Sequence, residues 1–234
     1  MNLFLLQIAD TASKAAQAVN AAATGEAPGD LNLINLLFQG GVLMIPLFLL
    51  LVLALYFFFE RWIAINKASK IDENFMSIIK DHILSGNVVA ARSLAKNTGH
   101  PVARIIDKGL QRIGKPIDAI EKSMENVGRL ETYKLERNLG VLSLIAGIAP
   151  MFGFLGTIVG MVQLFYGISS TGEYTLSTIA SGIYVKMITS ATGLIIGLLA
   201  YVGHSFLNAQ VDKTVNKMEV ASSDFLDTLQ EPTR

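Results

Sequence analysis

Residues 149–165 read APMFGFLGTIVGMVQLF, an uncharged apolar stretch that carries glycines at three- and four-residue steps. Residues 182–201, GIYVKMITSATGLIIGLLAY, have the same character with a single charge, Lys186. Residues three and four apart share one face of a helix, and small side chains on that face let two helix backbones approach closely inside a membrane. Both stretches therefore predict membrane helices that pack against other helices.

The composition of the whole chain fits a membrane protein. Of its 234 residues, 51% are hydrophobic and 16% are charged, against about 25% charged in a typical soluble domain. The 19 basic and 19 acidic residues balance, so the basic surface that binding to nucleic acid requires is not indicated. Cysteine is absent and the three histidines are far apart in sequence, so we expect no disulfide, no metal site and no cofactor.

Runs without charge define three expected spans. Residues 42–59 are uncharged and predict a first span over 42–65, with an apolar surface suited to lipid. The second span is expected over 138–168 and the third over 178–207, with a short polar loop at 169–177 between them.

The region between the first two spans, residues 66–137, is polar. Its apolar residues recur at helical spacing and predict a domain of short amphipathic helices, with breaks near Gly86, at 99–101 and at 114–116. From Asp118 the pattern predicts one uninterrupted helix that leads into the second span.

The two ends of the chain are polar or mixed. Residues 1–41 suit either an interfacial amphipathic helix or a frayed alanine-rich tail, and the lack of a basic residue before their apolar run indicates a segment that is retained. Residues 208–234 predict a polar tail that continues the third helix. Thirteen Lys and Arg residues fall within 66–137, so this domain and the C-terminus are expected in the cytoplasm and the N-terminus in the periplasm.

Hydroxyl groups in the second and third spans are candidates for an ion pathway. They belong to Thr157, Thr189, Ser190 and Thr192. The competing interpretation is that they only pack helices, as we expect for Gly153, Gly156, Gly160, Gly193 and Gly197. Neither span contains an acidic residue, whereas proton relays in membranes normally use Asp, Glu or His. A proton pathway here therefore needs a carboxylate from another chain.

Two charged positions near or within the spans have alternative interpretations. Lys186 either extends toward the outer headgroups or lines an inner cavity and pairs with a partner's acid or a lipid phosphate. Glu60 and Arg61, at the inner end of the first span, are interpreted as an interfacial anchor rather than a gate.

The motif with Pro150, Gly153, Gly156, Thr157 and Gly160 resembles the MotA/TolQ/ExbB family of ion-driven inner-membrane motors, most closely its ExbB branch. The SATGL sequence at 190–194 extends this resemblance. The resemblance implies an all-α protein that assembles as a ring, commonly a pentamer, in the bacterial inner membrane. It also implies a dimer of ExbD- or TolR-like single-span partners bearing an aspartate, a TonB-like protein, and contacts with membrane lipids.

The resemblance also assigns roles to residues. Thr157 matches the pore threonine of the second span, and Ser190 takes the place of the third-span threonine, with Thr189 and Thr192 beside it. The glutamate that many members carry in the third span falls at Val185, so it is missing here. This departure indicates a different entry path on the outer side.

The resemblance implies a proton-channel subunit that uses the proton motive force to energise TonB-dependent outer-membrane transport. A TolQ-like role in envelope maintenance, or in a gliding or secretion motor, is the alternative within the family. A structural membrane scaffold without ion conduction is an alternative of another class. An enzyme is not expected, because residues 66–137 carry no phosphate loop, nucleophile elbow, metal-ligand spacing or paired acids.

Overall fold

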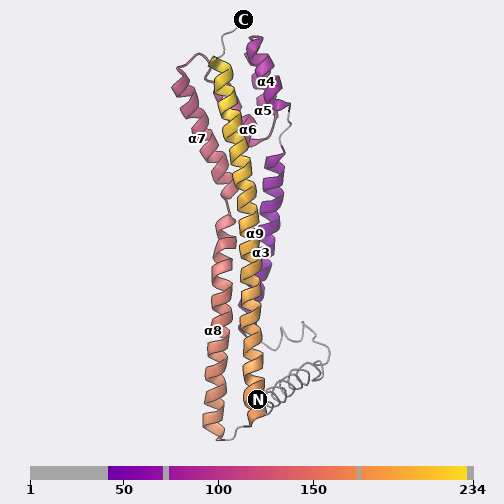
Figure 1. Ribbon diagram of the computed structural model, residues 1–234, viewed down its shortest axis with the longest axis vertical. Coiled ribbons are helices and arrows are strands. Elements are labelled where there is room, and N and C mark those ends of the chain that lie inside the picture. The colour runs from indigo at the N-terminus through magenta and orange to yellow at the C-terminus, as the bar shows by residue number, and fades with distance from the viewer. Residues whose placement is uncertain (1–41, 71–73, 173–174, 231–234) are drawn as a thin grey trace, which may run out of the picture.

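The computed structural model describes residues 42–70, 74–172 and 175–230, and within these ranges every regular element is a helix (Figure 1). The all-α prediction is confirmed for this part of the chain. The N-terminal segment 1–41, with its two alternative interpretations, lies outside the described residues.

Among the residues that the structure describes, three helices are long and apolar enough to cross a membrane, judged by length and composition. They involve α3 (Met44–Ser69), α8 (Leu139–Thr171) and α9 (Leu176–Gln230). The last has 55 residues, which at 1.5 Å per residue makes a rod of about 80 Å. The expected third span and the expected polar tail, as far as residue 230, are therefore one continuous helix. Gly172, in the left-handed conformation (φ 67°), ends α8.

Helix α3 packs one side against α8 and α9 and leaves the rest of its surface open. Leu47 and Ala54 are buried on the packed side, whereas Phe48, Tyr56 and Phe59 are exposed. Pro46 lies in the first turn, where a missing N–H leaves no helical bond unmade. The exposed apolar surface is the one expected to contact lipid.

Three short helices follow, with breaks where the sequence predicts them. They are α4 (Phe75–Leu84), α5 (Val88–Asn97) and α6 (Pro101–Leu110). The Asn87 side chain accepts a hydrogen bond from the Ala90 amide at 3.1 Å and so caps α5. Helix α6 begins with Pro101, which has no N–H to leave unsatisfied in a first turn. Helix α7 (Ile117–Glu136) then runs back toward the apolar half of the molecule (Figure 1).

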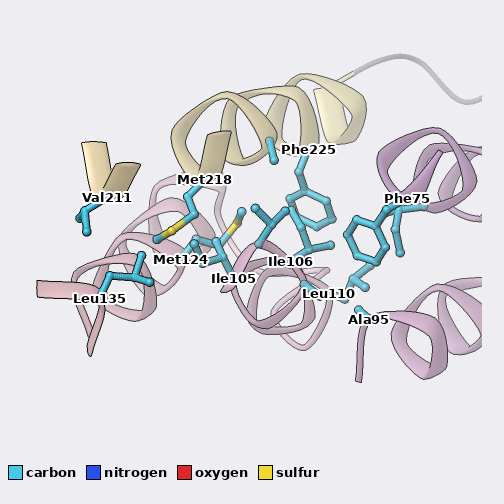
Figure 2. Packing of buried hydrophobic residues seen from close by; sticks show 14 of the residues in the cluster. Phe75, Ala95, Ile105, Ile106, Leu110, Met124, Leu135, Val211, Met218 and Phe225 are labelled. Carbon is cyan, nitrogen blue, oxygen red and sulfur yellow. The ribbon is translucent and has the colours of Figure 1, made fainter. Parts of the chain in front are cut away.

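These four helices and the C-terminal part of α9 enclose a hydrophobic core, and together they are called the polar domain below. Figure 2 shows how Ile106 and Leu110 of α6, Met124 of α7 and Phe225 of α9 converge. Phe225 is fully buried. A methyl group on Gly109 would lie 2.5 Å from the Phe225 ring. The absence of a side chain at Gly109 therefore leaves the space on α6 that this ring occupies.

The helix expected to run uninterrupted from Asp118 into the second span is interrupted, so this prediction is wrong. Arg137 is extended and Asn138 is left-handed, with φ 67°, which separates α7 from α8. Asparagine is among the few residues that adopt this conformation readily, because its side chain can hydrogen-bond locally. The Asn138 amide donates to Glu60 at the inner end of α3, across 3.3 Å.

Arg61 lies at the same joint and is buried, with its side chain 5% exposed, rather than anchored at a solvent interface. Its Nη2 donates to the carbonyl of Lys134 in the last turn of α7 at 3.4 Å. A helix C-terminus carries partial negative charge and unpaired carbonyls, so a guanidinium is favourable there. Glu60 and Arg61 therefore tie the first span to the α7–α8 joint.

Candidate functional site

The candidate site lies on the hairpin of α8 and α9, whose apolar halves run antiparallel along a seam of small residues, called the α8–α9 seam. Three pairs face each other in order along it. They are Gly153 with Gly193, Gly156 with Thr189, and Gly160 with Lys186. The five glycines expected to pack helices all lie on this seam, with Gly197 one turn beyond Gly193 against Pro150.

The contact at the centre of the α8–α9 seam is backbone against backbone. A methyl group on Gly193 would lie 2.6 Å from the Ala149 carbonyl oxygen and 2.8 Å from Gly153 Cα. A methyl group on Gly197 would lie 2.6 Å from the Pro150 ring. Neither position has room for any side chain. The glycines therefore fix how closely α8 and α9 approach.

Thr189 is part of the seam itself. It is fully buried, and its methyl group fills the space over Gly156, where an added Cβ would lie 2.5 Å away. A side chain in this position packs α8 against α9 of the same chain. Of the four candidate hydroxyl residues, Thr189 is thus the clearest packing residue.

Two other hydroxyls bond to their own helices. The Thr157 hydroxyl donates to the Phe154 carbonyl at 2.7 Å, and the Thr192 hydroxyl donates to the Ile188 carbonyl at 2.9 Å. Such bonds use the hydroxyl hydrogen and leave the oxygen able to accept a hydrogen bond from another donor. Ser190 is half-buried beside the seam.

Thr192 and Ser190 lie on opposite flanks of α9. Thr192 precedes Ile196 by one turn, and Ile196 is buried in the cluster that α3 forms with α8 and α9. Ser190 lies two positions before Thr192. At 100° per residue, this rotates Ser190 by about 200° around α9 from Thr192, to the opposite flank. Thr192 therefore lies on the α3 side of the hairpin, and Ser190 on the side that α3 does not cover.

Thr157 is likewise turned away from α3. Phe152 on α8 packs into the same α3 cluster, and Thr157, five residues later, is rotated from it by about 140°. The hairpin thus has one face covered by α3 and one open face that carries Thr157 and Ser190, called the open face below. Thr189 and Thr192 are not brought to this face.

Lys186 lies with its aliphatic stem across Gly160, so the glycine provides the notch in which the stem rests. The side chain is half-buried. Neither α8 nor residues 176–211 of α9 contain a carboxylate. Within the part of the chain that the structure describes, no three acidic or histidine side chains gather as metal ligands.

Sequence reasoning named the seam glycines but missed what they contact. Gly193 lies against the Ala149 carbonyl, and Gly197 lies against the Pro150 ring. Gly182 likewise lies against the Leu164 side chain. The signal available in the sequence for these contacts was Pro150, a proline among small residues in a span. Its ring takes the place of the N–H hydrogen and projects toward a neighbouring helix. The pairing register itself needs the three-dimensional arrangement.

Comparison with known proteins finds a match to the MotA/TolQ/ExbB proton channel family over residues 97–220. A putative biopolymer transport protein ExbB homolog of Methanothermobacter thermautotrophicus is 25% identical over 186 residues, 78% of this chain and 65% of the relative. The biopolymer transport protein exbB1 of Vibrio cholerae is 36% identical over 90 residues, 38% of this chain and 40% of the relative.

A Tol-Pal system protein TolQ, from Pseudomonas aeruginosa, is 26% identical over 119 residues, 49% of this chain and 52% of the relative. The chain thus spans less than two thirds of the length of each of these three relatives. Relatives named for both branches, ExbB and TolQ, share similarity with the chain.

Proposed function

Because this chain belongs to the MotA/TolQ/ExbB proton channel family, we propose that it is the proton-channel subunit of an ExbB-type motor in the bacterial inner membrane. It is a multi-pass membrane protein with three apolar helices. In the proposal, several copies, five by the resemblance, stand in a ring with their open faces toward a central pore.

The observation that carries this proposal is the open face of the hairpin. It presents the hydroxyls of Thr157 and Ser190 next to a seam that contains no carboxylate. A hydroxyl titrates far from neutral pH, so it can position a proton or a water but does not store the proton. The titrating group in the proposal is an aspartate on a single-span partner helix, which the ring encloses as a dimer.

The distribution of charge supports an orientation. Residues 66–137 hold thirteen Lys and Arg residues, whereas residues 172–175 hold none. The positive-inside rule then places the polar domain and the C-terminus in the cytoplasm and the N-terminus in the periplasm. In this orientation a proton that enters past Lys186 leaves beside the polar domain.

In the proposal, the motor drives transport that depends on a TonB-like protein. Two of the relatives compared above carry names of biopolymer transport, and the third is named for the Tol-Pal system. A deletion strain should therefore lose energised uptake across the outer membrane while its envelope stays intact. A detergent-sensitive envelope with normal uptake would favour the TolQ-like role instead.

The test of ion conduction removes the two open-face hydroxyls together, as Thr157→Ala with Ser190→Ala. The complex, purified with its native partner and reconstituted in vesicles, should assemble normally but take up protons about tenfold more slowly, because each lost hydroxyl removes a hydrogen-bonding position on the pathway. Thr192→Ala is the matched control, since it deletes the same group on the α3 side and should leave uptake unchanged.

The same experiment separates the proposal from a purely structural role. A scaffold needs the seam glycines but not the open-face hydroxyls. If the double variant conducts protons at the rate of the unmodified complex, these hydroxyls do not line the pathway. If the unmodified complex itself takes up no protons, the scaffold is the better description.

A further inference from the structure

A groove of about 610 Å³ lies between α7 and α9 in the polar domain, called the α7–α9 groove. Its floor is apolar and includes Met124, Met218 and Leu226. The first two are buried, and Leu226 is half-buried. A groove of this size with an apolar floor suits a short segment of another polypeptide chain.

The rim of the α7–α9 groove is acidic. Four exposed glutamates belong to it, namely Glu121, Glu125, Glu136 and Glu219. Among the described residues that line the groove, the only basic one is Arg129, which is paired with Glu125 at 2.5 Å. The rim therefore has a net charge of −3, four acidic residues less one basic. A ligand with apolar and basic side chains would complement both the floor and the rim.

The groove lies on the continuation of the open face. Leu226 follows Ser190 by 36 residues, about ten full turns at 3.6 residues per turn, and both belong to the single helix α9. Val215, also in the groove lining, follows Ser190 by 25 residues, about seven turns. A helix that runs along Thr157 and Ser190 would therefore emerge on the side of α9 where the groove opens.

We propose that the α7–α9 groove binds the cytoplasmic tail of the single-span partner, the segment that immediately precedes the partner's membrane helix. The inference rests on the proposed function. Short cytoplasmic segments next to a membrane helix are enriched in Lys and Arg. Such a tail offers the positive charge that the acidic rim lacks and apolar side chains for the floor. The groove would hold the partner's tail while its membrane helix moves within the ring.

A second copy of this chain is the competing occupant. Residues 74–116 carry seven basic and two acidic residues, so a neighbour's α4–α6 region could also meet the acidic rim. The test must therefore identify which chain is captured and which part of it.

A photoreactive residue in the groove makes that identification. We expect Ser222→p-benzoylphenylalanine, in the full chain in its native membrane, to capture a single-span protein on illumination. Mass spectrometry should place the adduct on the residues just before that protein's membrane helix. The same substitution at Val220, which is exposed outside the groove lining, is the control and should give no such adduct. An adduct with a second copy of this chain, or no adduct above the control, overturns the proposal.

Charge reversal tests the acidic rim. Glu121→Lys with Glu219→Lys should reduce the Ser222 adduct about tenfold, because the rim then repels a basic tail. Asp224→Lys, which reverses an exposed charge of α9 outside the groove lining, should leave the yield unchanged. Equal yields for both variants would contradict recognition by charge.

A third photoreactive position distinguishes failure of this inference from failure of the proposed function. Leu194 is exposed one turn from Ser190, and an adduct there should fall within the partner's membrane helix. If Leu194 captures that helix and Ser222 does not capture the tail, only the groove assignment fails. If neither position captures a single-span protein, the proposed function fails as well.

Discussion

Helix α9 is packed by two different physical means along its length. In its apolar half it meets α8 through glycines, and Gly193 lies against the bare backbone of Gly153. In the polar domain it contributes Phe225, which is fully buried among Ile106, Leu110 and other large side chains (Figure 2). One half is held by close approach of two backbones, the other by burial of apolar volume.

The difference follows from the solvent around each half. Water makes burial of apolar surface favourable by roughly 25 cal/mol per Å², so a domain in water gains from large buried side chains. Lipid tails are as apolar as leucine, so a helix in lipid gains mainly from dense contact between backbones. The two regions should therefore respond in opposite ways to adding and to removing side-chain volume.

Removing volume should do most damage in the polar domain. Phe225→Ala is expected to destabilise that domain by about 4 kcal/mol, because the fully buried ring leaves a cavity next to Gly109. Hydrogen exchange should speed up in α6 and in the end of α9 and stay slow along the α8–α9 seam. Val220→Ala, at an exposed position of the same helix, should change neither. If the seam also opens, the two regions are one cooperative unit and the comparison does not hold.

Adding volume should do most damage in the seam. Gly193→Val is expected to cost about 3 kcal/mol, because its Cβ would lie 2.6 Å from the Ala149 carbonyl oxygen and a backbone cannot move aside as a side chain can. Thermal unfolding in detergent, followed by tryptophan fluorescence or by aggregation, measures the loss.

Gly147→Ala, on the same helix α8, is the control for the seam, because outside the local helix backbone no atom lies within 4 Å of the added methyl group. It should match the unmodified protein. Equal losses at Gly147 and Gly193 would mean that glycine matters for chain flexibility and not for close approach.

The existence of the seam was predictable from sequence, but its pairing was not. Glycines at three- and four-residue steps show that each helix has a narrow face. Which glycine faces which depends on how far the two antiparallel helices are shifted along each other, and no repeat in the sequence specifies this shift. For the same reason the spacing of Thr189, Ser190 and Thr192 did not reveal that Thr189 lies over Gly156.

In the polar domain, charged side chains interact where the apolar core meets the surface. Glu131 is nearly buried, and it accepts hydrogen bonds from Arg104 at 2.5 Å and from Lys134 at 2.7 Å. Burial alone raises the pKa of Glu131, but these two hydrogen bonds and the two positive charges outweigh it and hold the pKa below its usual value of 4.5.

Glu131→Gln should therefore destabilise the polar domain at neutral pH by about 2 kcal/mol, because a neutral amide makes weaker bonds to Arg104 and Lys134. A carboxyl with a lowered folded-state pKa stabilises the fold above pH 4.5, and this contribution disappears as the pH falls through the folded-state pKa. The unmodified protein should thus lose more stability than the variant below pH 4.5. Parallel pH profiles would show that the ion pairs contribute nothing.

The joint between the two regions was the part that sequence reasoning missed. Residues from Asp118 onward keep a helical pattern, so periodicity predicts no break. The signal available was the asparagine, a residue that commonly adopts the left-handed conformation at a helix end. What fixes the break is Glu60 and Arg61, which lie 78 and 73 residues away from their partners in sequence and so leave no local trace.

Substitutions at Asn138 should have the smallest effect and should show whether the joint is strained. Asn138→Ala is expected to cost about 1 kcal/mol, because alanine disfavours φ 67° and cannot donate to Glu60. Asn138→Gly loses the same hydrogen bond but tolerates the left-handed backbone, so it should cost less than Asn138→Ala. Thermal unfolding of the two variants side by side measures the difference. If the two variants cost the same, the hydrogen bond to Glu60 and not the backbone conformation determines the joint, and the first span controls how α7 meets α8.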